Sequence, residues 1–253
     1  MIRTLLLDIE TAPHVAYIWR LYDDYVPIDR VITSGYTLCW AAKWHGDKTI
    51  MFDSTHKSSA RKMIRRIHGL LDEADAVVHY NGKKFDLPIL QQEFTQLEMR
   101  PPSPARQIDL LETTRKKFRF ASNKLDFVVQ RLGLGAKVPN KGMELWTGCM
   151  SGDEKSWKEM ERYNRGDVVI LERLYDKLLP WIDNHPNASL YSDTDKPTCP
   201  NCGSTNLQRR GIARTNVSIY ARFQCKNCGA WARGRNNQLP KELQSSVLAR
   251  ATG

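Results

Sequence analysis

Acidic residues recur where the chain is expected to end a strand or to begin a helix. Asp8 and Glu10 lie two residues apart in the run 5–11, so on a strand they project to the same face. Two neighbouring carboxylates repel each other unless a cation lies between them, and a divalent metal ion would relieve that repulsion. The alternative is an exposed strand end that carries two solvated acids.

Asp86 and Asp167 lie in two further segments where an acidic side chain could bind a metal ion. Asp86 follows a predicted strand and an Asn81-Gly82 turn and begins a predicted helix, where taken alone it is an ordinary helix N-cap. Tyr163 precedes Asp167 by four residues in a long predicted helix, so the phenol and the carboxylate share one face, along an edge of the apolar stripe. The alternative is a surface Asp beside a half-buried Tyr.

A mixed α/β fold is expected to position these side chains. Apolar patterns predict strands at 4–9, 35–44, 48–52, 76–80 and 107–111, and helices at 58–74, 85–97, 124–132 and 154–179. Three successive strands followed by alternating helices and strands indicate a mixed sheet with helices on its faces. The stretch between the strand at 4–9 and residue 35 is predicted to be polar.

Together, the three acidic segments resemble the DEDD exonucleases of the ribonuclease H-like superfamily. The similarity is to the tyrosine subtype, which includes the proofreading domains of B-family polymerases. The segment 7–11 is similar to the first motif, 81–86 to the second, and Tyr163-x-x-x-Asp167 to the third. The resemblance covers about residues 1–183, and it implies a ribonuclease H-like mixed β-sheet flanked by helices.

The resemblance implies a metal-dependent 3′-to-5′ exonuclease. Asp8, Glu10, Asp86 and Asp167 would hold two Mg²⁺ or Mn²⁺ ions, because hard divalent cations prefer oxygen ligands and a pair of them can activate water and stabilise a leaving 3′ oxygen. Tyr163 would orient the attacking water or the phosphate, because a phenol with an ordinary pKa of about 10 is a poor base at neutral pH.

The resemblance also implies a nucleic-acid partner. Thr11, Asn81 and Phe85 match positions that contact the terminal nucleotide or support the site. Single-stranded DNA is the favoured substrate, and a separate DNA polymerase or replication protein is a further candidate partner.

Two roles stay open in the sequence. Asp109 resembles a frequent strand-end Asp of the family, where it could make a structural hydrogen bond or act near the metals. Family members often have a lysine before the third motif. Lys137, Lys141 and Lys155 all fit this position, so the sequence assigns none of them.

Four of the six cysteines form two Cys-x-x-Cys-Gly turns, Cys199 with Cys202 and Cys225 with Cys228. Each turn directs two thiolates at one point, and two turns complete a tetrahedral Zn²⁺ site, which we favour over a redox dithiol or a pair of disulfides. The residues 212–223 between the turns are predicted to form a strand. The module therefore resembles a zinc ribbon that needs one structural Zn²⁺ to fold.

Most of the net charge of +10 lies on this module, since residues 199–253 carry nine Lys and Arg against one acidic residue. Cations interleaved with aromatic rings suit single-stranded nucleic acid, because phosphates pair with the cations and bases stack on the rings. The predicted nucleic-acid contacts are Arg209, Arg210, Arg214, Arg222, Tyr220 and Trp231. Alternatively, the aromatic residues form the small core of the ribbon and the arginines are solvated, and docking of a protein to the ribbon also stays open.

The patterns predict a domain at 1–183, a linker at 184–198, the zinc ribbon at 199–235 and a polar, disordered tail at 236–253. The sequence contains no apolar run long enough to span a bilayer and no secretory signal, so we expect a cytoplasmic protein without a membrane partner. Two alternatives to the exonuclease remain. One is a metal-dependent endonuclease, and the other is a non-catalytic ribonuclease H-like module that binds nucleic acid or docks to a protein.

Overall fold

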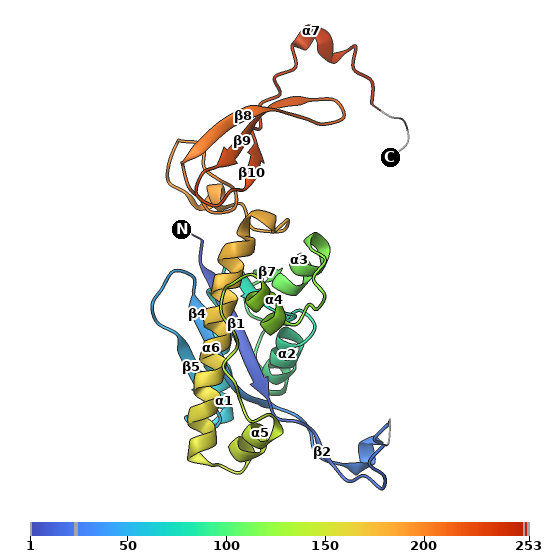
Figure 1. The fold of residues 1–253 in the computed structure, drawn as a ribbon, viewed down its shortest axis with the longest axis vertical. Helices are drawn as coiled ribbons and strands as arrows, with labels where there is room; N and C mark the ends of the chain where they lie inside the picture. Colours follow the sequence, from blue (N-terminus) through green and yellow to red (C-terminus); the bar gives the residue numbers. More distant parts are fainter. Residues whose placement is uncertain (1, 23–24, 250, 252–253) are drawn as a thin grey trace. The chain divides into compact units, whose positions relative to one another are not determined.

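The computed structural model describes residues 2–22, 25–249 and 251. The chain divides into two compact units, Arg3–Tyr175 and Asp176–Gly253, the latter together with Met1–Ile2. The first unit contains a mixed sheet with its helices, and the second contains the cysteine module (Figure 1). No helix in the described ranges has the length and apolar character needed to cross a membrane.

The first unit is built around a five-stranded sheet with the strand order β5-β4-β1-β6-β7. Its strands are β1 (Thr4–Thr11), β4 (Thr37–Trp44), β5 (Met51–Ser54), β6 (Ala76–His79) and β7 (Arg106–Asp109). Strands β1, β6 and β7 are parallel, whereas β4 is antiparallel to both β1 and β5. The carboxyl ends of β1, β5, β6 and β7 therefore lie along one edge, which we call the carboxyl edge.

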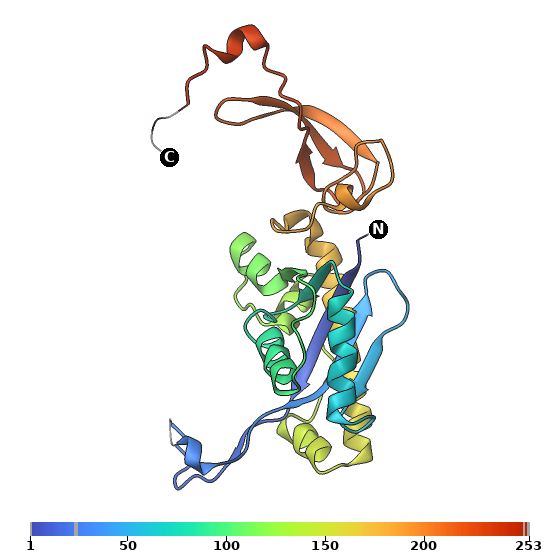
Figure 2. The ribbon, with the colours of Figure 1, turned by 180° about the vertical axis from the view of Figure 1, so that it is seen from behind.

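Helices cover both faces of this sheet. They are α1 (Ala60–Asp72), α2 (Asp86–Gln96), α3 (Leu110–Lys117), α4 (Leu125–Arg131), α5 (Met143–Met150) and α6 (Glu154–Leu178). Helix α6 lies in front of the sheet in Figure 1, and α1 and α2 lie in front of it in the reverse view of Figure 2. The predicted mixed α/β class is confirmed. Helices α3 and α5 were not predicted, and α3 begins at Leu110, inside the range 107–111 that its apolar residues assigned to a strand.

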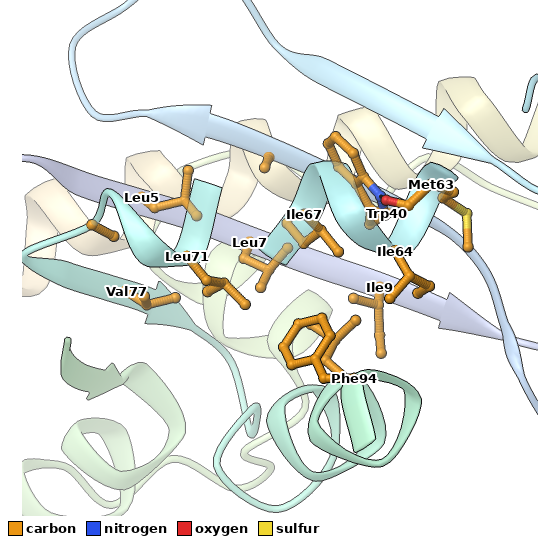
Figure 3. Close-up of a cluster of buried hydrophobic side chains, with 13 residues drawn as sticks. Leu5, Leu7, Ile9, Trp40, Met63, Ile64, Ile67, Leu71, Val77 and Phe94 are labelled. Atoms are coloured by element: carbon orange, nitrogen blue, oxygen red, sulfur yellow. The ribbon is translucent and has the colours of Figure 1, made fainter. Parts of the chain in front are cut away.

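The alternation of side chains along β1 separates the apolar core from the acidic residues. Leu5, Leu7 and Ile9 pack against Met63, Ile64 and Ile67 of α1 in a buried cluster (Figure 3). The intervening residues of β1, which include Asp8 and Glu10, project to the face covered by α6, because successive strand residues point to opposite faces. Burial of Leu5, Leu7 and Ile9 therefore fixes the face to which Asp8 and Glu10 point, since a shift of the strand register by one residue would exchange the two faces.

A short two-stranded arm follows β1, formed by β2 (Val15–Ala16), the 3-10 helix η1 (Ile28–Arg30) and β3 (Val31–Thr33). The prediction of a polar stretch was wrong here. The arm exposes large apolar side chains, and Trp19 is 86% accessible. Strands of two and three residues are too short for an alternating pattern to reveal them.

The second unit contains a three-stranded sheet in the order β10-β9-β8. Its elements are the 3-10 helices η2 (Leu179–Trp181) and η3 (Ala188–Tyr191), the strands β8 (Leu207–Arg214), β9 (Ile219–Cys225) and β10 (Trp231–Arg233), and the helix α7 (Lys241–Gln244). The strand predicted at 212–223 is two strands, because a turn closed by the Thr215 N–H and the Ser218 carbonyl divides it.

Both segments that flank the ribbon contain short helices. Helix η3 lies inside the predicted linker 184–198, where the Ala188 N–H donates a hydrogen bond to the Pro200 carbonyl at 2.8 Å. Helix α7 lies inside the predicted tail 236–253, of which residues 250, 252 and 253 are outside the described residues.

Candidate metal centres

Three carboxylates from two elements meet on the sheet face covered by α6. Asp8 and Glu10 come from β1 and Asp167 from α6, and one oxygen of each lies within 4.8 Å of the others. Asn164, one turn before Asp167, anchors the two elements through its Nδ2, which donates to Asp8 Oδ2 at 2.6 Å. The spacing that places Asp8 and Glu10 on one face of a strand therefore brings them to the acidic residue of the helix.

Asp86 joins this group from the start of α2. The Ile9 N–H donates to Asp86 Oδ1 at 3.1 Å, which ties the helix to β1 between the two acidic residues of that strand. The N-cap position of α2 is Phe85, and no side-chain hydrogen bond caps that end. Asp86 is buried, and its negative charge contributes to raising the pKa values of both Asp8 and Glu10.

Asp167 shows most clearly that the cluster can take a cation. Its Oδ2 accepts a hydrogen bond from Lys137 Nζ at 2.6 Å, whereas its Oδ1 is buried and has no hydrogen-bond partner among the described residues. A buried carboxylate oxygen without a partner is costly, and a metal ligand is one of the roles that satisfy it. Asp8, Glu10 and Asp167 therefore fit a divalent cation by the position and the chemistry of their oxygens.

Burial and like charge raise the pKa values of these carboxyl groups. The pKa of Asp8 lies well above its ordinary value because the group is buried and faces Glu10, Asp167 and Asp86. Burial and the charge of Asp167 raise the pKa of Glu10 to about 8, and burial raises that of Asp86 to about 6. The metal-free site therefore retains protons at neutral pH, and a bound cation would displace them.

Metal binding should stabilise the protein more at pH 8 than at pH 6. A carboxyl group whose pKa is higher in the folded state binds more protons folded than unfolded, so stability of the metal-free protein falls as pH rises through the window from about 4.5 to about 8. Because Mn²⁺ requires deprotonated oxygens, saturation should raise the melting temperature at pH 8 by about 5–10 °C, which corresponds to about 2.7 kcal/mol at 100 times Kd.

Thermal melts after dialysis into Mn²⁺-free buffer would measure both effects. The Glu10→Gln variant is the matched control, since it loses one titrating group and one metal ligand. It should show a weaker pH dependence and a smaller response to Mn²⁺. A metal-free protein that becomes more stable from pH 6 to pH 8, with no response to Mn²⁺, would contradict this expectation.

Lys137 and Tyr163 form the rim of the cluster. Lys137 Nζ donates to the Tyr163 hydroxyl at 3.1 Å as well as to Asp167. Burial alone would lower the pKa of Lys137, but the charge and hydrogen bond of Asp167 outweigh it and keep the ammonium charged. Burial and the charge of Asp167 raise the pKa of Tyr163 to about 12, so the phenol stays protonated at neutral pH and can donate its proton in a hydrogen bond.

Lys137 and Asn164 are the site residues that the sequence did not assign. Of the three candidate lysines, Lys137 contacts Asp167, whereas Lys141 pairs with Glu144 on the surface. The sequence signal that could have identified Lys137 is Gly166, a glycine inside α6. A Cβ there would lie 2.7 Å from Val138 Cγ2, so glycine lets the loop that carries Lys137 approach the helix.

Asp109 accepts structural hydrogen bonds in the turn that precedes Asp86. Of the two roles that the sequence left open for Asp109, this favours the structural one. Its Oδ1 accepts the N–H of Asn81 at 2.9 Å and that of Leu111 at 3.0 Å, and it is the N-cap of α3. Burial would raise its pKa, but His79 and these N–H groups outweigh burial and lower it. Asn81 has the uncommon φ of 68°, and hydrogen bonding from its N–H to Asp109 helps to hold that conformation.

The other predicted contacts of this site lie along the carboxyl edge. Thr11 ends β1 and is half-buried, and Asn81 follows β6 and is also half-buried. Phe85 is 44% exposed at the start of α2, so its ring is accessible from solvent instead of lying in the core.

The four cysteines of the second unit converge on one point. Their sulfur atoms all lie within 4.8 Å of one another, and Cys199 Sγ and Cys202 Sγ lie 3.6 Å from those of Cys228 and Cys225, respectively. Disulfide bonds would need about 2.05 Å, whereas the edge of a tetrahedron with Zn–S bonds of about 2.3 Å is about 3.8 Å. The cluster could therefore hold one metal ion, and its chemistry and spacing fit zinc.

The backbone of both turns is preorganised for this role. Gly203 and Gly229 have φ values of 71° and 83°, and their N–H groups donate to the carbonyls of Cys199 and Cys225. Burial would raise the pKa of Cys225, but the backbone N–H groups of Cys228 and Asn227 outweigh it and lower the pKa to about 7. One thiol of the cluster is therefore partly ionised at neutral pH before any metal binds.

Aromatic rings and arginines alternate on the surface of the second unit. Trp231 is 51% exposed, with the guanidinium of Arg222 5.0 Å and that of Arg210 6.0 Å from its ring centroid. Arg233 lies 4.2 Å over the ring of Tyr220. The buried cluster of this unit consists of cysteines, Ala230 and Leu207, so these two rings lie outside it. Arg209 and Arg214 are exposed on β8.

The arrangement of the first unit is that of a ribonuclease H-like α/β protein, in which a mixed sheet flanked by helices carries acidic residues on its central strand. A family model described as the RNase H superfamily matches residues 34–179. Because this match covers more than half of the chain, the protein belongs to the RNase H superfamily. The match includes Asp86, Tyr163 and Asp167, and it begins after β1.

Among solved structures, the chain is similar to the family B DNA polymerase from the hyperthermophilic archaeon Pyrobaculum calidifontis. The two share 21% sequence identity with a TM-score of 0.53, and the match covers 71% of this chain and 25% of the polymerase chain. The matched part therefore spans a quarter of the polymerase, and the likeness shows a shared fold. No curated protein matches this chain.

Proposed function

We propose that the first unit is a metal-dependent 3′-to-5′ exonuclease of the tyrosine subtype of the DEDD nucleases. The observation that carries the proposal is the meeting of Asp8, Glu10 and Asp167 within 4.8 Å, with Asp86 beside them and Tyr163 on the rim. Membership of the RNase H superfamily and the likeness to a DNA polymerase support a nuclease. Single-stranded DNA is the proposed substrate.

In the proposed reaction, a water oxygen bonds to the phosphorus of the last phosphodiester and the bond to the 3′ oxygen of the preceding nucleotide breaks. The products are a nucleoside 5′-monophosphate and a strand shorter by one nucleotide. Asp8, Glu10, Asp86 and Asp167 would hold two Mg²⁺ or Mn²⁺ ions, which when bound lower the pKa of water and offset the charge of the leaving oxygen.

The side chains at the rim have their own parts in this reaction. Lys137 holds both Asp167 and the Tyr163 hydroxyl, so it fixes the direction of the phenol. Because the pKa of Tyr163 is raised to about 12, the phenol donates a hydrogen bond to the water or to a phosphate oxygen and does not act as the base. Correct orientation of the water is the contribution that we assign to this pair.

The Tyr163→Phe substitution should lower kcat by about 10- to 100-fold and leave KM nearly unchanged, because it removes orientation and no charge. Steady-state hydrolysis of a single-stranded oligonucleotide measures both constants. The loss of kcat caused by Lys137→Met should be smaller in a protein that already carries Tyr163→Phe than in the parent, since the two residues act through one hydrogen bond. Equal losses in kcat and in binding, with additive effects, would make Tyr163 a structural residue.

For the second unit, we propose one structural Zn²⁺ and a contribution to nucleic-acid binding. The cysteine geometry supports the first part, and the exposed Trp231 with its two arginines supports the second. A chain ending at residue 198 should bind single-stranded DNA more weakly and with a smaller salt dependence than the full chain. Unchanged affinity and salt dependence would refute the binding role of the ribbon.

Linear and circular single-stranded DNA distinguish the proposed exonuclease from the alternatives. An exonuclease degrades the linear strand and leaves the circle intact, whereas an endonuclease cuts both. A protein that binds both strands and cuts neither in Mg²⁺ or Mn²⁺ would be a non-catalytic module. The same assay on linear RNA tests the preference for DNA.

A further inference from the structure

A run at the start of α1 has an unusual charge for the first unit. Residues 54–71 contain five Lys and Arg and no Asp or Glu, whereas the rest of residues 3–175 contains 22 basic and 23 acidic residues. Lys57 of this run pairs with Glu161 of α6. The other four cations lie in the first two turns of the helix.

These four cations line a hollow of about 300 Å³ together with Ser59. Arg66 pairs with the buried Asp53 at 2.8 Å. The side chains of Arg61, Lys62 and Arg65 make no hydrogen bond or ion pair with any other residue that the structure describes, and all three are exposed. Met63, Ile64 and Ile67 turn the opposite face of the helix into the core, so the helix cannot rotate to separate these cations. Cations three and four residues apart on a helix repel one another, and a bound polyanion would relieve that repulsion.

The hollow lies near the carboxyl edge, on the face opposite to the acidic cluster. The strand register aligns Glu10 with Cys39 and Cys39 with Ser54, so the end of β5 is two strand spacings, about 10 Å, from Glu10. Helix α1 begins six residues after Ser54 and covers the sheet face opposite to α6 (Figures 1 and 2). A nucleic-acid strand whose 3′ end lies at the carboxylates would therefore reach α1 by passing the end of β5.

We propose that Arg61, Lys62 and Arg65, with Arg66 beside them, bind the phosphodiester backbone of the substrate strand several nucleotides away from its 3′ end. The proposal rests on the nuclease function proposed above. The lining contains cations and one hydroxyl group and no aromatic ring, so it offers charge and hydrogen bonds to phosphate oxygens and no surface for base stacking. Binding there is independent of base sequence and increases the affinity for long strands.

The test compares two triple variants that lose the same charge. Arg61→Gln/Lys62→Gln/Arg65→Gln removes the patch, and Lys48→Gln/Arg100→Gln/Arg131→Gln removes three exposed cations that are scattered over the same unit. Affinity is measured by fluorescence anisotropy across a salt titration. The probe is a long single-stranded DNA with hydrolysis-resistant phosphorothioate links at its 3′ end. Cleavage of an unmodified dinucleotide is measured in parallel.

The patch variant should bind the long strand about tenfold more weakly at low salt. Its slope of log K against log salt should be smaller in magnitude by about 2, or about 0.7 for each lost phosphate contact. Its dinucleotide cleavage should equal that of the parent, because a dinucleotide at the carboxylates does not reach α1. The scattered control should change the slope much less.

Equal effects of the two triple variants on affinity and slope would overturn the patch and leave the nuclease function standing, provided that the parent cleaves the dinucleotide. A parent that binds the long strand through the patch and cleaves nothing would instead refute the nuclease function. In a parallel anisotropy titration with a labelled acidic peptide as the probe, loss of peptide affinity in the patch variant with DNA binding unchanged would assign the patch to a protein partner and overturn the proposal.

Discussion

The Asp8→Asn substitution is expected to lower the hydrolysis of single-stranded DNA by about a thousandfold or more, a loss of about 4 kcal/mol of transition-state stabilisation. Asp8 lies at the centre of the cluster, where Glu10, Asp167 and Asp86 all act on its charge. The neutral side chain removes a proposed metal ligand and keeps an oxygen for the Asn164 amide. Initial rates at saturating Mg²⁺ or Mn²⁺ measure the effect.

Loss of folding cannot produce this result, because the substitution removes repulsion from the metal-free site. The variant should melt at the same temperature as the metal-free parent or above it. Asp47→Asn is the matched control, since it neutralises an exposed acid in the turn after β4. An Asp8→Asn protein that retains a tenth or more of the parent activity would remove Asp8 from the metal site.

Removal of the metal from the cysteine cluster is expected to unfold the second unit. The buried cluster of that unit is formed by Cys199, Cys225 and Ala230, with the other two cysteines and Leu207 packed against it. Without a metal, the cysteines gain no coordination bonds, and the only other members of the cluster among the described residues are Ala230 and Leu207. Structural zinc contributes about 10–16 kcal/mol in small modules of this kind, which is comparable to the whole stability of a typical domain, about 5–15 kcal/mol.

Elemental analysis should find one zinc per chain, and a Cys199→Ser/Cys225→Ser protein should contain none. Limited proteolysis should then cleave within residues 199–235 of the variant and leave the first unit intact. Cys149→Ser, which changes a buried cysteine of the first unit, should retain the zinc. A resistant second unit in the absence of metal would show that its fold does not depend on the cluster.

Local patterns were sufficient to predict the strands of the sheet and four of its flanking helices, whereas the resemblance to the DEDD exonucleases joined the acidic residues into one predicted site. The alternation along β1 placed Asp8 and Glu10 on one face, and the core face of the strand fixes which one. The interval of four residues between Tyr163 and Asp167 likewise depends only on helical geometry. These features depend on periods of two or about 3.6 residues, which the sequence displays directly.

Features that depend on contacts between distant segments could not be predicted. Three lysines fitted the position before the third motif, and the hydrogen bond that selects Lys137 joins it to Asp167, a residue 30 positions further along the chain. Asn164 was missed because a buried Asn on a helix has no pattern of its own until its partner on β1 is known. The role of Asp109 likewise depends on the adjacent ends of β6 and β7.

Identification of the product released from the strand end tests the central proposal most directly. Single-stranded DNA that carries a label in its 3′-terminal nucleotide is incubated with the protein in buffer with Mg²⁺ or Mn²⁺ and in buffer without either ion. The proposal predicts that the label appears first as a nucleoside 5′-monophosphate, in the presence of metal only, and that the Asp8→Asn protein releases about a thousandfold less. First release of the label in longer fragments, or no release at all, would contradict the assignment of these carboxylates to a 3′-to-5′ exonuclease.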